Sequence, residues 1–434
     1  MKSVKLTGIL VAVLFFTANT FALNSNISFD QNGNTAEITT EINATTPDAE
    51  IIPEPLLDNK AAVLPTVEKK ALKKWTVMVF VNAKNNLESY GLSDVNEMEM
   101  IGSSDEVNIV TELGRLPGYS SADGDWKGSR RYLIEKDANK YAITSPILME
   151  IPNSDMGDWE YLVEFVKWSM EKYPAENYML TVWNHGSGWN KDNMFESSKG
   201  LSYDDTSGNH MTTPQIRMAM EKIGKINIFS MDACLMQMAE VAYEIKDYTD
   251  YVVASEETEP ADGYTYDTYL GPLVNNPNMN GAELSKATVD SYINHYASAG
   301  RSGTQSSIKT AAFDGFVSML NDWIKTAMDA NEKEAVVTAK NGAQDFYYSS
   351  NKDIYHFIQL VAENAKNESL IAKSNDLLKF MKDNLLSYNN TTGYNYNNAY
   401  GLAVYMPSYS SSSYSVLKWA ADTQWDEFIS WYNK

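Results

Sequence analysis

The chain has 434 residues, of which 44% are hydrophobic, and a formal net charge of -22. This length and apolar content predict two packed units with a sizeable core. The negative charge argues against nucleic acid or an anionic membrane surface as a partner, because both would repel the chain. It leaves room for a basic peptide substrate, although many secreted proteins are acidic for solubility alone.

The first residues have the pattern of an export signal. Lys2 and Lys5 form a charged start, an apolar run follows over residues 6–16, and residues 20–22 offer a small-residue cleavage site. The run is shorter than the roughly 20 apolar residues that a membrane-spanning helix needs. We therefore expect a signal peptide over residues 1–22 and a secreted or periplasmic protein without a transmembrane segment.

Three further regions follow the signal peptide. Residues 23–70 are polar with little periodicity, which is typical of a disordered linker or pro-segment. Strands then alternate with helices to about residue 270, a pattern that predicts a mostly parallel sheet covered on both faces. We expect an α/β/α sandwich over residues 71–270, and a mainly helical region over 271–434 that packs on it.

Hydrophobic periodicity locates the individual elements. In chain order they are a strand at 75–82, a helix at 87–101, strands at 107–113 and 131–135, a helix at 158–173 capped by Asp158, a strand at 178–183, a helix at 214–223, a strand at 226–231, a helix at 235–248 and a strand at 251–255. The C-terminal region is expected to add helices at 282–297, 316–330, 353–364 and 370–388, and a strand at 400–406.

Cys234 is the single cysteine, so the chain cannot form an internal disulfide. A lone cysteine is most often a small buried hydrophobe. Its position favours chemistry instead, because Cys234 follows the strand at 226–231 and His185 follows the strand at 178–183. Active sites of parallel sheets lie beyond the carboxyl ends of the strands. We therefore expect Cys234 to be a nucleophile and His185 its base.

The neighbours of the pair suggest further roles. Cys234 would lie at the N-terminus of the following helix, whose dipole favours a thiolate. The backbone amides of Gly186 and Cys234 could form an oxyanion hole. Asp232 could line the pocket for the side chain before the cut bond, where a carboxylate selects Arg or Lys, or it could cap the following helix.

Other titratable residues give weaker signals. His210, His295 and His356 have no partner at metal-ligand spacing, so we expect no zinc site, and nothing predicts a cofactor. The acidic pairs at 204–205 and 256–257 are expected to be solvated. They leave glycosidase chemistry open, but no motif places either pair.

Four segments together resemble the clostripain family of cysteine peptidases, which shares the caspase-like fold: residues 75–82, 184–186, 232–236 and 254–260. The similarity runs from about residue 75 to residue 270 and extends more faintly to 401–407. It implies a His185 and Cys234 dyad with no essential third member. It also implies peptide or protein substrates that are cut after Arg, or Lys, with Asp232 on the floor of the pocket.

The resemblance also implies self-cleavage between His185 and Cys234. The loop at 189–202 offers Lys199-Gly200 as the preferred bond and Lys191-Asp192 as the second. We expect a monomer or a self-cleaved two-chain form.

One departure from the family lies after the last predicted strand of the sheet. Related sequences usually continue Glu-Pro-Gly-x-Gly-Trp, whereas residues 259–264 read Glu-Pro-Ala-Asp-Gly-Tyr, which leaves the choice between Arg and Lys open. Some family members respond to calcium, but no calcium loop of recognised form is present. The alternative function is a catalytically silent surface or binding protein that keeps the fold. The presence of both His185 and Cys234 disfavours it.

Overall fold

The computed structural model describes residues 72–189, 200–409 and 413–434. The expected signal peptide, the linker up to residue 70, and the two candidate cleavage residues, Lys191 and Lys199, lie outside these ranges. Among the described residues, no helix has the length and apolar character needed to cross a membrane.

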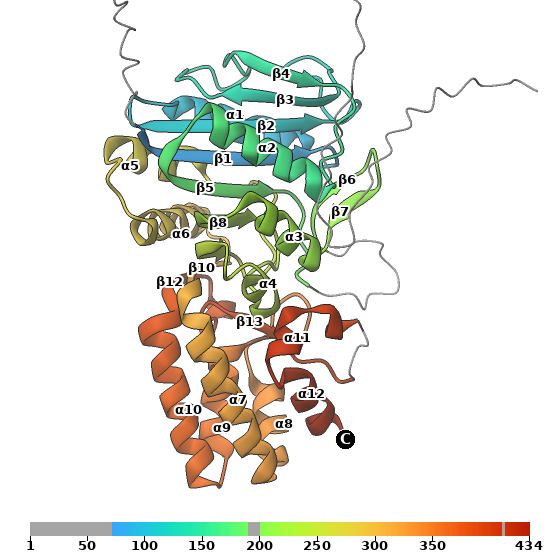
Figure 1. Cartoon of the computed structure of the whole chain (residues 1–434), viewed down its shortest axis with the longest axis vertical. Helices are drawn as coiled ribbons and strands as arrows, with labels where there is room; N and C mark the ends of the chain where they lie inside the picture. Colours follow the sequence, from blue (N-terminus) through green and yellow to red (C-terminus); the bar gives the residue numbers. More distant parts are fainter. Residues whose placement is uncertain (1–71, 190–199, 410–412) are drawn as a thin grey trace, which may run out of the picture. The chain divides into compact units, whose positions relative to one another are not determined.

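A nine-stranded sheet forms the centre of the fold (Figure 1). Its order is β12-β10-β9-β8-β5-β1-β2-β3-β4. The strands span Lys73–Ala83 (β1), Val107–Arg115 (β2), Gly128–Leu133 (β3), Ile147–Ile151 (β4), Ala175–Trp183 (β5), Ile226–Asp232 (β8), Thr249–Ala254 (β9), Gly303–Lys309 (β10) and Leu386–Thr392 (β12). The five strands from β9 to β2 run parallel, and an antiparallel pair closes each edge.

Helices cover both faces of this sheet. The side chains of β1 alternate between two apolar cores, with Val77 and Val79 in one and Met78 and Phe80 in the other. The first core is covered by α1 (Glu88–Ile101), α5 (Tyr266–Asn275) and α6 (Gly281–Ser298), and the second by α2 (Trp159–Lys172), α3 (Thr213–Ile223) and α4 (Ala239–Glu244). Strands buried on both faces explain the continuous apolar runs in the sequence. The predicted α/β/α sandwich with a mostly parallel sheet is confirmed.

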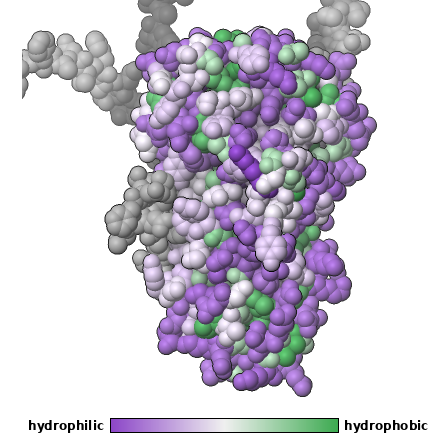
Figure 2. Space-filling view, turned by 180° about the vertical axis from the view of Figure 1, so that it is seen from behind, coloured by the Kyte–Doolittle hydropathy of each residue, from purple (hydrophilic) through white to green (hydrophobic). Residues whose placement is uncertain are grey.

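The residues after 270 build more than helices. Besides the end of α5 and all of α6, they form α7 (Phe313–Asp329), α8 (Lys333–Gly342), α9 (Ile354–Asn364), α10 (Glu368–Phe380), α11 (Lys418–Asp422) and α12 (Trp425–Asn433). Figure 1 shows α7 to α10 grouped next to β10 and β12. These two strands also come from this part of the chain, so the sheet extends beyond residues 71–270. The outer face in Figure 2 is largely hydrophilic, with apolar side chains in small scattered groups.

Smaller elements complete the described part. Two short antiparallel pairs join β6 (Leu201–Asp204) to β7 (Asn209–Met211), and β11 (Asn351–Asp353) to β13 (Ala403–Tyr405). Single turns of 3-10 helix lie at Thr310–Ala312, Tyr394–Tyr396 and Tyr414–Val416.

Two predicted helices are wrong in part. The helix expected at 370–388 ends at Phe380, and a π-helical turn at Met381–Leu385 leads into β12, because residues 386–392 pair with β10. The helix expected at 235–248 is reduced to α4. The amide of Leu235 donates to the carbonyl of Glu257 (3.0 Å), and that of Gln237 donates to Ser255 (2.9 Å). These bonds hold residues 235–238 against the chain that leaves β9, so they cannot form a first helical turn.

Candidate active site

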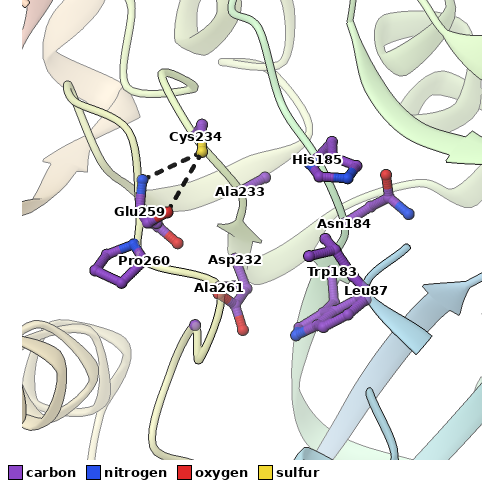
Figure 3. Close-up of a pocket in the computed structure, with 11 residues that line it drawn as sticks. Leu87, Trp183, Asn184, His185, Asp232, Ala233, Cys234, Glu259, Pro260 and Ala261 are labelled. Carbon is purple, nitrogen blue, oxygen red and sulfur yellow. Dashed lines mark hydrogen bonds between the residues drawn. The ribbon is translucent and has the colours of Figure 1, made fainter. Parts of the chain in front are cut away.

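The site lies where β5 and β8 end. These neighbouring strands are parallel, and Trp183 on β5 is the register partner of Asp232 on β8. His185 and Cys234 each follow two residues later, and both line one cavity of about 100 Å³ (Figure 3). The structure therefore brings together His185 and Cys234, the two residues that the sequence placed at the ends of these strands.

Three segments of chain enclose this cavity. They are the end of β5, the end of β8 and the loop that follows β9, with one further residue, Leu87, from the start of α1. The lining residues are Leu87, Trp183, Asn184, His185, Asp232, Ala233, Cys234, Glu259, Pro260, Ala261 and Gly263. The loop with the altered sequence thus borders the cavity beside Cys234.

Asn184 and Asn86 position His185. The Asn184 side chain donates to the carbonyl of Tyr203 (3.2 Å) and to that of Asn82, and its Oδ1 accepts from the amide of Tyr203 (2.8 Å). The ring of His185 contacts Asn86 through Nε2 and Oδ1 (2.7 Å). Burial lowers the pKa of His185, and the charge of Asp205 opposes this shift. A lowered pKa keeps the imidazole neutral near pH 7, as a general base requires.

Cys234 faces the loop after β9. The amide of Glu259 donates to its Sγ (3.2 Å), and its thiol donates to the carbonyl of Glu259 (3.7 Å) (Figure 3). Burial raises the pKa of Cys234 to about 11, and the charge of Glu259 adds to this rise. The expectation of a thiolate at a helix N-terminus is wrong, because α4 begins only at Ala239. The raised pKa favours the neutral thiol near pH 7.

The backbone next to Cys234 is tightly packed and has an unusual conformation. Leu235 has a φ of 63°, a left-handed conformation that a bulky residue rarely adopts. Gly186 packs so closely that an added Cβ would lie 2.4 Å from the Cys234 carbonyl oxygen and 2.9 Å from Met236 Cγ. Close packing therefore requires glycine at 186, whatever its amide contributes to an oxyanion hole.

Asp232 is buried, at 3% exposure, at the base of the cavity. It accepts from the amide of Tyr264 (3.2 Å) and from the hydroxyl of Tyr266 (2.9 Å). Gly263, with a φ of 57°, lets the loop lie against the carboxyl, because a Cβ there would be 2.8 Å from Oδ1. Since α4 is capped at Met238, Asp232 does not cap a helix.

Asp232 belongs to a group of four acidic residues, with Asp94, Glu97 and Glu259. No Lys or Arg among the described residues forms an ion pair with any of these four. Asp94 accepts from the indole of Trp183 (2.6 Å). Burial is the main cause that raises the pKa of each group, and repulsion from neighbouring acidic groups adds to the rise for Asp94, Glu97 and Glu259. The described residues thus supply no Lys or Arg to pair with these carboxyl groups.

Some residues at this site were not predicted to have a role. Asn86 and Glu259 carry no recognisable spacing, although Asn86 follows the end of β1 and Glu259 lies in a segment that resembles the family. Of the two acidic pairs that were expected to be solvated, only Asp205 is exposed. Asp204 is buried against Lys84 (2.8 Å), and Glu256 and Glu257 are buried.

The remaining histidines lie in separate surroundings. His210 stacks on Tyr203 with ring centroids 5.0 Å apart, and His356 accepts through Nδ1 from the amide of Gln344 (2.9 Å). Within residues 72–189, 200–409 and 413–434, no group of His, Cys, Asp and Glu is arranged to hold a metal ion.

The caspase-like sandwich, with His185 and Cys234 at neighbouring strand ends, places this fold and site in the class of cysteine peptidases. The clostripain family model matches residues 79–431, so the chain belongs to the clostripain family. It is 28% identical to clostripain of Hathewaya histolytica over 235 residues, which are 48% of this chain and 45% of that protein. The chain thus aligns with less than half the length of this relative.

Solved structures share the fold. One is a secreted C11 cysteine protease from Bacteroides thetaiotaomicron in complex with an irreversible peptide inhibitor, at 18% identity and a TM-score of 0.61. Another is an inactive zymogen C11 protease from Parabacteroides distasonis, at 20% identity and a TM-score of 0.61. Each match covers 83% of this chain and 99% of the other.

Proposed function

We propose that the protein is an endopeptidase that cleaves after a basic residue and uses His185 and Cys234 as its dyad. The observation that carries this proposal is the pair of buried carboxyl groups, Asp232 and Glu259, in the cavity next to Cys234, with which no Lys or Arg of the described residues pairs. Buried charges are normally paired. A lysine or arginine side chain from a substrate supplies the missing charge and brings the following peptide bond beside the thiol.

The chemical step follows from the two strand ends. His185 takes the proton of the thiol as Cys234 attacks the substrate carbonyl carbon, and the carbonyl oxygen becomes an oxyanion that the amides of Gly186 and Cys234 bind. The imidazolium then gives its proton to the leaving amine, and a thioester remains. A water molecule, deprotonated by His185, hydrolyses the thioester and restores the thiol.

The hydrogen bonding of the Cys234 thiol must change before this reaction. Cys234 is hydrogen-bonded to the backbone of Glu259, and its raised pKa makes the thiol a weak nucleophile there. Rotation of the thiol away from Glu259 and toward His185 gives the proton an acceptor. A substrate that fills the cavity contacts the Glu259 loop directly, so substrate binding and this rotation are linked.

The test compares short fluorogenic peptides that end in Arg, Lys or Glu before the reporter group. Wild type should release the reporter from the Arg and Lys peptides and not from the Glu peptide, and Cys234→Ala should release none. Equal release by wild type and Cys234→Ala would disprove the proposal. A folded wild type that cuts none of the peptides would instead favour a catalytically silent binding protein.

We also propose export and self-cleavage at Lys199-Gly200, with Lys191-Asp192 as the second bond. The charged and apolar start of the chain supports export, and the existence of an inactive zymogen relative supports processing. Purified wild type should separate into two chains whose new N-terminus is Gly200, and Cys234→Ala should stay intact. An intact active wild type would contradict self-cleavage at either bond.

A further inference from the structure

Two carboxyl groups, from different parts of the fold, face the cavity beside Cys234. Asp232 comes from the end of β8, and Glu259 comes from the loop after β9. We propose that Glu259 is a second specificity residue that acts with Asp232 to select arginine over lysine. The inference rests on the proposed function, because it concerns the same cavity.

The two carboxyl groups are held in contact with each other. Glu259 Oε1 accepts from Gln305 Nε2 on β10 (3.2 Å), while its Oε2 is buried and accepts from no N–H or O–H group. The same side chain is in hydrogen-bonding contact with the carboxyl of Asp232. Two carboxylates at this separation repel unless a proton lies between them. We infer that Asp232 and Glu259 form an acid pair that shares one proton.

Both members of the pair have fixed positions. Asp232 is fixed by Tyr264 and Tyr266, and Glu259 is fixed by Gln305 on one side and by its backbone bonds to Cys234 on the other. The two carboxyl groups therefore cannot both reorient to contact one and the same ligand atom. A ligand that satisfies both must present hydrogen-bond donors in two directions from within the cavity.

A guanidinium group meets this requirement better than an ammonium group. Arginine carries five N–H donors in a rigid plane, whereas lysine carries three on one nitrogen. Glu259 Oε2 has no other donor, so the group that enters the cavity must reach it as well as Asp232. An arginine side chain can bond both carboxylates at once, and the shared proton then leaves to solvent as the cation takes its place.

The groups around the pair are acidic or neutral. From α1 it is faced by Asp94 and Glu97, from its own loop by Tyr264, and from α5, α6 and the end of β8 by Tyr266, Tyr269, Tyr292, Tyr296 and Cys234. His185, from the end of β5, lines the same cavity. Arg301 pairs with Asp262, and both side chains are exposed at 55%. No described cation therefore replaces the shared proton, and protons compete with the substrate cation for the pair.

The experiment uses the full chain and two fluorogenic peptides that differ only in Arg or Lys before the cut bond. Glu259→Gln keeps the shape of the side chain and its backbone bonds to Cys234 but removes the charge. We expect the ratio of kcat/KM for Arg over Lys to fall roughly tenfold, mainly through KM for the Arg peptide. The KM of wild type for the Arg peptide should rise from pH 7 to pH 5.5, and that of Glu259→Gln should rise less, because Asp232 still titrates in this range.

Two controls make the result specific. Asp267→Asn removes a charge that acts on Glu97 without lining the cavity, and it should leave the Arg to Lys ratio unchanged. Because the charge of Glu259 contributes to the raised pKa of Cys234, alkylation of Cys234 by iodoacetamide should be no slower in Glu259→Gln than in wild type. If Glu259→Gln slows alkylation and lowers kcat/KM equally for both peptides, Glu259 positions Cys234 and the specificity role is overturned. An unchanged ratio with retained activity also overturns it.

Binding separates this inference from the proposed function. In calorimetry, Cys234→Ala should bind the Arg peptide more tightly than the Lys peptide, and adding Glu259→Gln should remove the difference. A wild type that cuts neither peptide, combined with this binding preference, rejects the peptidase and keeps the role of Glu259. Equal binding of the two peptides by Cys234→Ala rejects the role of Glu259.

Discussion

Trp183 on β5 and Asp232 on β8 are direct register partners, and this pairing sets the relative positions of His185 and Cys234. His185 and Cys234 lie two residues beyond their respective partners, so they leave the sheet at the same level. The amide of Asn184 donates to the carbonyl of Asp232 (3.2 Å) and extends the pairing by one bond. A slip of one residue would turn one of the two strands over and separate the dyad.

Asp232→Asn should weaken the binding of basic substrates. The change removes a buried charge that a substrate cation would pair with, so we expect kcat/KM for an Arg peptide to fall by about 100-fold. Steady-state kinetics measure this loss. Asp250→Asn, which removes an exposed charge that pairs with Lys225, is the control and should behave as wild type. Full activity of Asp232→Asn on the Arg peptide would show that another group binds the substrate.

Gly186→Ala should disrupt the site through a steric clash. The new Cβ would lie 2.4 Å from the Cys234 carbonyl, so one of the two strand ends must move. We expect a loss of more than about 2 kcal/mol in the free energy of unfolding together with loss of peptidase activity. Gly271→Ala in α5 is the matched control, because its Cβ meets only Ile101 Cδ1 at 3.5 Å. Denaturant unfolding that gives equal values for both variants would contradict the clash.

The free enzyme should react slowly with alkylating agents at neutral pH. Burial raises the pKa of Cys234 to about 11, so only a small fraction is thiolate near pH 7. The rate of reaction with iodoacetamide should rise about tenfold for each pH unit from 7 to 10. Mass spectrometry of the labelled protein measures this rate, and Cys234→Ala gives the background. A rate that levels off below pH 8 would mean that Cys234 and His185 form a thiolate and imidazolium pair before substrate binds.

Glu256→Gln should stabilise the protein at alkaline pH. Glu256 and Asp353 are buried in hydrogen-bonding contact, and burial raises the pKa of both, that of Asp353 to about 6. Carboxyl groups with raised pKa values stabilise the fold in acid, and this contribution is lost as pH rises through their folded pKa values. A glutamine amide donates to Asp353 without a proton from solvent.

The measurement is the melting temperature as a function of pH. Glu256→Gln should melt about 2–4 °C above wild type at pH 9 and lose this advantage at pH 4. Glu334→Gln, at an exposed position, should follow wild type throughout. A constant difference at both pH values would show that the pair shares no proton.

The sequence predicted most of the central sheet because buried parallel strands are apolar along their whole length. It also predicted the cap of α2, where the side chain of Asp158 accepts from the amide of Glu160 (3.0 Å). It did not predict β12, because Thr391 pairs with Thr304 across a long separation that local periodicity cannot reveal. For the same reason the contact between Asp232 and Glu259 was missed, since it depends on how one loop folds over another strand end.

The loop that carries Glu256 and Glu259 is held by parts of the chain far downstream. Gln305 on β10 donates to Glu259, the amide of Gly401 donates to Glu256 (3.0 Å), and Asp353 shares the pair with Glu256. A chain truncated at residue 270 would still contain His185, Cys234 and Asp232. It would lack all three of these supports and would expose the edge of β9, so we expect peptidase activity to require residues beyond Gly401.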